Sequence, residues 1–132
     1  MALDLDDLGA AVETFLVERH LATLTLVRPD GTPHVTPVGF SYDAEARLAR
    51  IITWAGSRKA RLAASAPAGV AAAVTQVDGG RWLTFEGVAT CTDDPERVAA
   101  AVAGYTARYR EPKARDDRVA IELAVTRIMG RA

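Results

Sequence analysis

The chain has 132 residues, of which 49% are hydrophobic and 25% charged, and this predicts a single globular domain spanning residues 1–132. The net charge of −1 argues against nucleic acid as a partner, and the single cysteine, Cys91, excludes a disulfide framework and a cysteine-based metal site. The acidic start is wrong for a secretory signal, and the weakly polar run 62–77 is broken by Pro67 and Gly69, so we expect no membrane span and a cytoplasmic location.

The first elements in chain order are an amphipathic helix and a hairpin. Helical spacing of apolar residues predicts the helix, and the residues are Leu5, Leu8, Val12, Phe15 and Leu16. Leu21–Val27 reads as a strand, and a turn at 28–31 leads to a second strand, His34–Tyr42. Pro37 cannot donate a ladder hydrogen bond, so this strand is expected at an edge or bulged there.

A third strand and a short helix form the middle of the chain. Arg47–Thr53 is expected to be the strand, and Ser57 is a good N-cap for a helix that ends before Pro67. Two further strands, Val70–Val77 and Arg81–Thr92, flank a turn at 78–80.

The last elements are a long helix, a loop and a strand. Asp94 is the predicted cap and Pro95 the first helical residue. The charged, proline-containing segment 110–117 reads as a loop, and 118–128 alternates as a strand does. Six strands joined mostly by hairpins predict a mainly β fold with flanking helices, in which an antiparallel sheet closes into a barrel.

The stretch from Thr53 to Leu62 is the strongest candidate for a binding site. A helix start leaves amide protons unpaired, and Arg58, Lys59 and Arg61 add full positive charges beside it. From Ala46 to Val77 there is no acidic residue, so a phosphate would find a favourable potential here. A turn followed by a solvated basic helix is the alternative interpretation.

The other candidates each have a structural alternative. Trp54 and Trp82 could stack on a ring or pack in an interface, and Arg81 could bind a substrate carboxylate or bridge to Glu86 or another nearby acid. His34 is a candidate general acid, whereas His20 lies where a helix end would use it as a cap. No paired ligands suggest a metal site, and no serine or cysteine lies in a nucleophile motif.

The order of these segments resembles the split β-barrel flavin- and deazaflavin-binding proteins related to pyridoxamine 5'-phosphate oxidase. The likeness is strongest to their F420-dependent branch, which includes biliverdin reductases. The segments that carry it are 18–22, 33–35, 37–40, 56–57, 59–60, 76–79, 81–83 and 86–87. The resemblance implies a six-stranded split barrel of the FMN-binding type and a homodimer with the cofactor between two barrels.

The resemblance also implies roles for individual residues. Thr53, Ser57 and Lys59 would hold the cofactor phosphate, with Arg58 and Arg61 as helpers. The backbone of Pro37, Val38 and Gly39 would lie along the ring system. Gln76, Arg81 and Trp82 would approach the ring from a facing strand of this chain or of a second subunit.

The function expected from this resemblance is hydride transfer from reduced coenzyme F420 to a conjugated small-molecule acceptor, with biliverdin the named candidate. The alternatives are an FMN-dependent, pyridoxamine phosphate oxidase-like enzyme and a non-catalytic carrier of flavin, deazaflavin or tetrapyrrole. The proton donor stays open, with His34, Arg81 and water as candidates. The longer anionic tail of a deazaflavin would need further cations, for which Arg47 and Arg50 are candidates.

Overall fold

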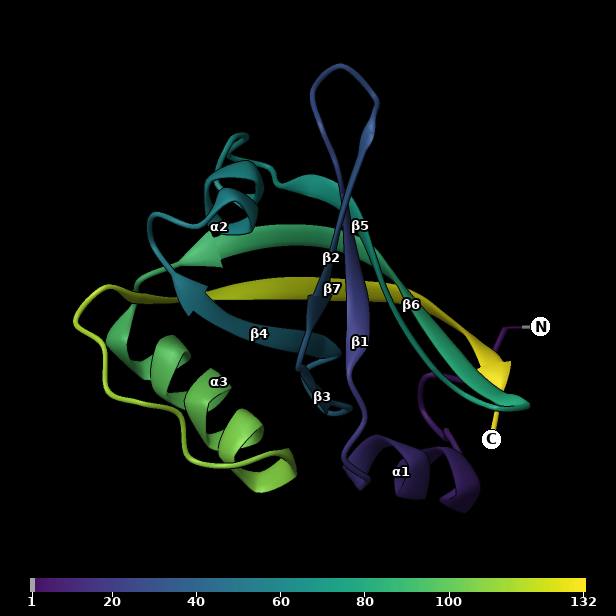
Figure 1. The fold of residues 1–132 in the computed structure, drawn as a ribbon. Coiled ribbons are helices and arrows are strands. Elements are labelled where there is room, and N and C mark those ends of the chain that lie inside the picture. Colours follow the sequence, from purple (N-terminus) through teal and green to yellow (C-terminus); the bar gives the residue numbers. More distant parts are fainter. Residues whose placement is uncertain (1) are drawn as a thin grey trace.

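The computed structural model describes residues 2–132. In chain order the elements are α1 (Ala10–Val17), β1 (Ala22–Val27), β2 (Pro33–Val38), β3 (Ser41–Asp43), β4 (Leu48–Trp54), α2 (Arg58–Ala63), β5 (Val70–Asp78), β6 (Arg81–Thr92), α3 (Pro95–Arg108) and β7 (Arg118–Arg131). The helices α2 and α3 gather at one end of the sheet, and α1 lies toward the other end, near the two termini (Figure 1).

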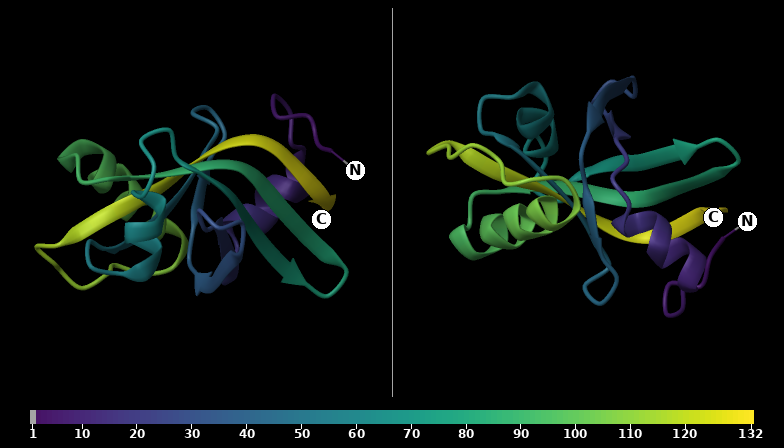
Figure 2. Two further views of the ribbon diagram at one scale, coloured as in Figure 1. Left: turned by 90° about the horizontal axis from the view of Figure 1, so that it is seen from above. Right: turned by 60° about the horizontal axis from the view of Figure 1, so that its bottom comes forward.

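All strands belong to one antiparallel sheet in the order β2-β1-β5-β6-β7-β4-β3. The long strands β6 and β7 coil strongly, as the views from above and below show (Figure 2). The mainly β, antiparallel fold was expected, but the predicted strand number of six was wrong. The described residues form seven strands, because segment 33–42 breaks at Gly39 and Phe40 into β2 and β3. The strands β2 and β3 lie at opposite edges of the sheet, and no pairing between the described strands joins these edges into a closed barrel.

The strand β2 is an edge strand, as Pro37 predicted. It pairs residue for residue with β1 from Val27↔Pro33 to Ala22↔Val38, so the alternative of a bulge was wrong. The structure places a bulge in β6 instead, between Glu86 and Gly87. A Cβ atom at Gly87 would lie 1.9 Å from the carbonyl oxygen of Ala124, so only glycine allows β6 and β7 to approach so closely there.

The core is built from the inward faces of the strands and one face of α1. Its largest fully buried side chains include Phe15, Phe40 and Phe85, and the rings of Phe40 and Phe85 meet edge to face with centroids 5.3 Å apart. Burying one such side chain contributes about 1.5 to 3 kcal/mol. These contacts fix the strands that carry the site.

The local helix signals were mostly confirmed. The hydroxyl of Ser57 accepts a hydrogen bond from the Ala60 amide, and the carboxylate of Asp94 accepts one from the Arg97 amide. The first helix was predicted too long, because Leu5 and Leu8 pack against the core from a turn that precedes it. Gly9, with φ of 86°, ends that turn, and the helix begins at Ala10. No helix within residues 2–132 has the length and apolar character needed to cross a membrane.

Candidate functional site

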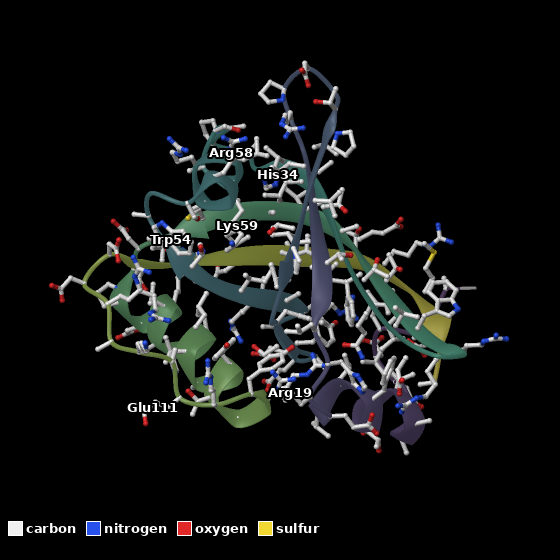
Figure 3. All side chains as sticks on the ribbon, viewed as in Figure 1. Arg19, His34, Trp54, Arg58, Lys59 and Glu111 are labelled. Atoms are coloured by element: carbon white, nitrogen blue, oxygen red, sulfur yellow. The ribbon has the colours of Figure 1, made fainter. Side chains whose placement is uncertain are left out.

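A cleft of about 730 Å³ lies where the ends of β2 and β4 meet α2, α3 and the loop that follows α3. Figure 3 shows Trp54 and Lys59 together beside α2, with Glu111 on the α3–β7 loop. The lining residues are Pro37, Val38, Gly39, Ile52, Thr53, Trp54, Lys59, Tyr105, Arg110, Glu111, Pro112, Lys113, Arg115 and Arg118. The cleft therefore combines the predicted Thr53–Leu62 region with residues more than 50 positions away.

The charge of the cleft is strongly positive. Among its described lining residues five are cationic, namely Lys59, Arg110, Lys113, Arg115 and Arg118, and one, Glu111, is acidic. Asp117 pairs with Arg115 at 2.9 Å, and Arg118 donates to the carbonyl of Lys113. A concave surface with an excess of cations concentrates anionic ligands.

Lys59 and Arg118 are half-buried, whereas Arg110, Lys113 and Arg115 are exposed. Burial lowers the pKa of Lys59, because the ammonium group loses water contacts. No carboxylate within residues 2–132 is among the causes that shift this pKa. An anionic ligand at this position would restore the lost stabilisation of the charge.

Trp54 lies between two cations. Lys59 Nζ is 5.4 Å from the centroid of its ring and Arg115 Cζ is 5.0 Å from it, both within cation–π range. The indole is 41% exposed and lines the cleft. Trp54 therefore holds two positive groups close to its ring and offers an exposed aromatic surface to a ligand.

Two buried hydroxyl groups precede Lys59 in the chain, and Thr53 lines the cleft whereas Ser57 does not. Thr53 Oγ1 donates to Ser57 Oγ at 2.9 Å, and the same oxygen accepts from the Ala60 amide at 3.2 Å. Thr53 is 6% and Ser57 5% exposed. Because Ser57 Oγ accepts twice, its own proton is left to be donated, and Thr53 faces the cleft directly.

The backbone of Pro37, Val38 and Gly39 lines the opposite wall. A Cβ atom at Gly39 would lie 3.0 Å from Tyr105 Cε2 and 3.1 Å from Tyr109 Cε2. The wall is therefore packed tightly against α3, and a side chain at Gly39 would push the two apart.

The remaining predicted cofactor residues lie outside this cleft in the described chain. Arg58 is exposed on α2, and Arg61 lines a separate groove with Cys91. Gln76 is fully buried, where its amide donates to the carbonyl of Phe15 at 3.2 Å and accepts from Arg108 at 2.8 Å. Trp82 lies at the start of β6, where it pairs with Arg131.

Neither candidate for proton transfer lines the cleft. His34 lies on the edge strand β2 with Nδ1 buried and unbonded among the described residues. Burial lowers its pKa, and so do Arg28, Arg58 and Lys59, so the imidazole is neutral at pH 7. Arg81 is held in an ion-pair cluster instead.

That cluster, here called the hairpin cluster, consists of Glu18, His20, Asp78 and Arg81. Arg81 Nη2 lies 2.9 Å from Glu18 Oε1 and 2.5 Å from Asp78 Oδ2, and His20 Nε2 lies 2.9 Å from the same Glu18 oxygen. The alternative that Arg81 bridges to Glu86 or another nearby acid is confirmed in its second form, with Glu18 and Asp78 as the partners. Glu18, His20 and Asp78 are close enough to suggest a metal site, but both carboxylates are already ion-paired with the Arg81 guanidinium.

The sequence reasoning missed the contribution of the α3–β7 loop. Arg110, Lys113, Arg115 and Arg118 were read as part of a charged loop and its following strand, and Arg47 and Arg50 were the candidates for additional cations. The structure pairs Arg47 with Asp6 and Arg50 with Asp43 at 3.0 Å. Four basic residues within nine positions, beside one proline, were the available signal.

Comparison with known proteins gives a family match over most of the chain. Residues 8–131 match the family described as pyridoxamine 5'-phosphate oxidase. A curated relative, the F420H(2)-dependent biliverdin reductase of Mycobacterium tuberculosis (strain CDC 1551 / Oshkosh), is 45% identical over 118 residues, which are 89% of this chain and 84% of the relative.

Solved structures give the same fold. An F420 reductase superposes with a TM-score of 0.68 at 27% identity, covering 89% of this chain and 94% of its own. The heme storage protein HutZ of Vibrio cholerae has a TM-score of 0.71 at 18% identity, with 98% and 95% of the two chains covered. A conserved hypothetical protein of Mycobacterium tuberculosis has a TM-score of 0.74 at 22% identity, covering 99% of this chain and 89% of its own.

Proposed function

This chain belongs to the pyridoxamine 5'-phosphate oxidase family, and we propose that within it the protein is an F420-dependent oxidoreductase whose acceptor is biliverdin or a similar conjugated tetrapyrrole. The relative at 45% identity supports both the cofactor and the acceptor, and the solved F420 reductase at 27% identity supports the cofactor. The matched region spans the cleft from β2 to β7.

The observation that carries the proposal is the five-cation cleft around Lys59 and Trp54. Coenzyme F420 has a ribityl phosphate, as FMN has, and also a longer anionic tail. A phosphate alone needs one or two cations, whereas the α3–β7 loop adds three more to the cleft lining and Arg118, the first residue of β7, adds a fourth. The excess favours the ligand that carries more negative charge.

We assign the residues of the cleft as follows. Lys59 holds the phosphate with its ammonium group, and the hydrogen-bonded hydroxyl pair of Thr53 and Ser57 supplies one further proton to it. The backbone of 37–39 and the ring of Trp54 border the ring system. Arg110, Lys113, Arg115 and Arg118 meet the anionic tail.

When bound, the reduced deazaflavin supplies the hydride that the acceptor needs. The chain's own residues bind the phosphate, fix the orientation of the ring system and exclude water from the cleft. Arg58, Arg61 and Trp82 remain candidates only for a site shared with a second subunit, whereas Gln76 is fully buried and Arg81 is ion-paired within the chain.

We further propose that the protein acts as a homodimer of split barrels in the cytoplasm. The outer face of the sheet supports self-association. It carries a shallow groove of about 410 Å³, lined by threonine, alanine and valine residues, with Glu86 the one charged side chain among its described lining residues. Interface centres are depleted of charge in this way.

An FMN-dependent enzyme is the second candidate, because the phosphate contacts cannot distinguish the two cofactors. A carrier that binds the same ligands without turnover is the third. The heme storage protein shares the fold, but at 18% identity it supports the fold alone.

One experiment separates the three. Purified protein is mixed anaerobically with biliverdin and either reduced F420 or reduced FMN, and the absorption spectrum of the pigment is followed. Loss of the biliverdin band with F420 and not with FMN is expected. Loss with FMN alone would overturn the F420 assignment, and saturable binding of biliverdin without a spectral change over hours would identify a carrier.

A further inference from the structure

The end of α3 holds the backbone corner that forms one wall of the cleft. The corner is Gly39–Phe40, between β2 and β3, and it follows directly on the lining residues Pro37 and Val38. Neither of the Phe40 backbone polar groups bonds across a strand ladder, because Phe40 lies between the two strands. Both are satisfied by side chains of α3 and the residue that ends it.

Tyr109 and Arg108 make these bonds. The amide of Phe40 donates to Tyr109 Oη at 3.1 Å, and the carbonyl of Phe40 accepts from Arg108 Nη1 at 3.0 Å. Tyr109 Oη in turn donates to the carbonyl of His20 at 2.6 Å. One hydroxyl and one guanidinium therefore join the corner to the segment that follows α1.

Arg108 is unusual among the arginines of this chain. It is 7% exposed, and its remaining donors bond to neutral oxygens: the Glu18 carbonyl at 2.9 Å, the Phe15 carbonyl at 3.4 Å and Gln76 Oε1 at 2.8 Å. Burying a guanidinium without a carboxylate is costly, and the fork geometry of arginine is suited to several fixed acceptors at once. The bonds fasten three separate segments to the end of α3.

We propose that Arg108 and Tyr109 are positioning residues, which set the path of the Pro37–Gly39 backbone along the cleft without touching the ligand. The inference rests on the proposed function for its consequence, because the wall they set would border the bound cofactor. Tight packing of Gly39 against Tyr105 and Tyr109 transmits any shift of α3 to the wall.

The test uses Tyr109→Phe, which removes the hydroxyl and keeps the ring. Amide hydrogen exchange of Phe40 is measured by NMR on the full chain without cofactor, and F420 affinity is measured by fluorescence titration. We expect the Phe40 amide to exchange about tenfold faster and the F420 dissociation constant to rise about three- to tenfold, as for loss of one hydrogen bond. Arg108→Lys, which keeps the charge and loses the fork, is expected to change both in the same direction.

Arg97→Gln is the matched control. Arg97 lies at the other end of α3, where it forms an ion pair with the buried Glu122 of β7. Breaking this pair destabilises α3 away from the cleft. The substitution is expected to lower the melting temperature with Phe40 exchange and F420 affinity unchanged. An unaltered Phe40 amide or unaltered affinity in Tyr109→Phe, or an equal loss of affinity in Arg97→Gln, would overturn the positioning role. Failure of the parent protein to bind F420 would instead refute the proposed function, because the exchange measurement needs no cofactor.

Discussion

The cleft and the hairpin cluster are the two charged regions of the molecule that sequence reasoning connected with a site, and they differ in how their charges are balanced. In the hairpin cluster Arg81 is shared by Glu18 and Asp78, so its positive charge is neutralised within the chain. In the cleft five cations face one acidic lining residue in the described part of the chain. A guanidinium with its own carboxylates stabilises structure, whereas a half-buried cation such as Lys59, whose pKa no described carboxylate shifts, favours a ligand that carries negative charge.

The strongest test of this difference is a pair of alanine variants, one in each region. Lys59→Ala is expected to weaken F420 binding by an order of magnitude or more, because a charge-assisted contact contributes about 1.5 to 3 kcal/mol. Its melting temperature should change little, since removing a partly desolvated ammonium group relieves a cost of folding. Arg81→Ala should do the reverse, with a lower melting temperature and unchanged affinity. If the two variants lost affinity equally in a fluorescence titration, the comparison would fail.

The α3–β7 loop offers a second test, which separates the two candidate cofactors. Replacing both Arg110 and Lys113 with glutamine should weaken F420 binding about three- to tenfold, since each exposed charge contributes up to about 1 kcal/mol. FMN, which lacks the anionic tail, should bind with unchanged affinity. Titrations at low and high salt check the cause, because the F420 difference should shrink as salt screens the loop. Equal losses for both cofactors would remove the loop from the tail site.

The contribution of the hairpin cluster to stability should decrease in acid. Hydrogen bonds from Arg81, then from His20, lower the pKa of Glu18 from 4.5 to about 2. Since the folded-state pKa is the lower one, the stabilisation is fully present above pH 4.5 and is lost as pH falls toward 2. Thermal melts over this range should show a smaller acid dependence for Glu18→Gln than for the parent. F420 affinity at pH 7 should be the same for both.

The smallest effect is expected at His34. Its lowered pKa keeps the imidazole mostly neutral above pH 6.5, so in that range His34 is not the imidazolium that would act as a general acid. His34→Gln should therefore leave the pH dependence of biliverdin reduction unchanged between about pH 7 and 9. A parent profile that falls with rising pH, and a variant profile that lacks this fall, would show that His34 is the proton donor after all.

Local signals in the sequence were sufficient for most of the fold. The caps at Ser57 and Asp94, the turn at 78–80 and the bounds of β6 depend on residues within a few positions of one another, and each was confirmed. Thr53, Trp54 and Lys59 were placed in one site for the same reason, because a strand end and a helix start bring them together.

Features that depend on distant residues could not be predicted in this way. The break at Gly39–Phe40 is stabilised by Arg108 and Tyr109, nearly 70 residues later. The family resemblance implied that Gln76 contacts the ring, but its side chain is buried and its partner Arg108 is 32 positions away. Segment 110–117 was predicted only as a charged loop, because its charge pattern does not reveal that it lines the cleft.

The α3–β7 loop carries many charged residues but is attached to the sheet by few contacts. The amide of Ala55 donates to the carbonyl of Asp117 at 2.8 Å, and Arg115 stacks on Trp54. The strands β4 and β7 pair from Leu48↔Ala124 to Trp54↔Arg118 without any contribution from the loop. Its length and composition can therefore drift during evolution without disturbing the sheet. A single scaffold could in this way be tuned to cofactors of different size by exchanging one short, portable segment.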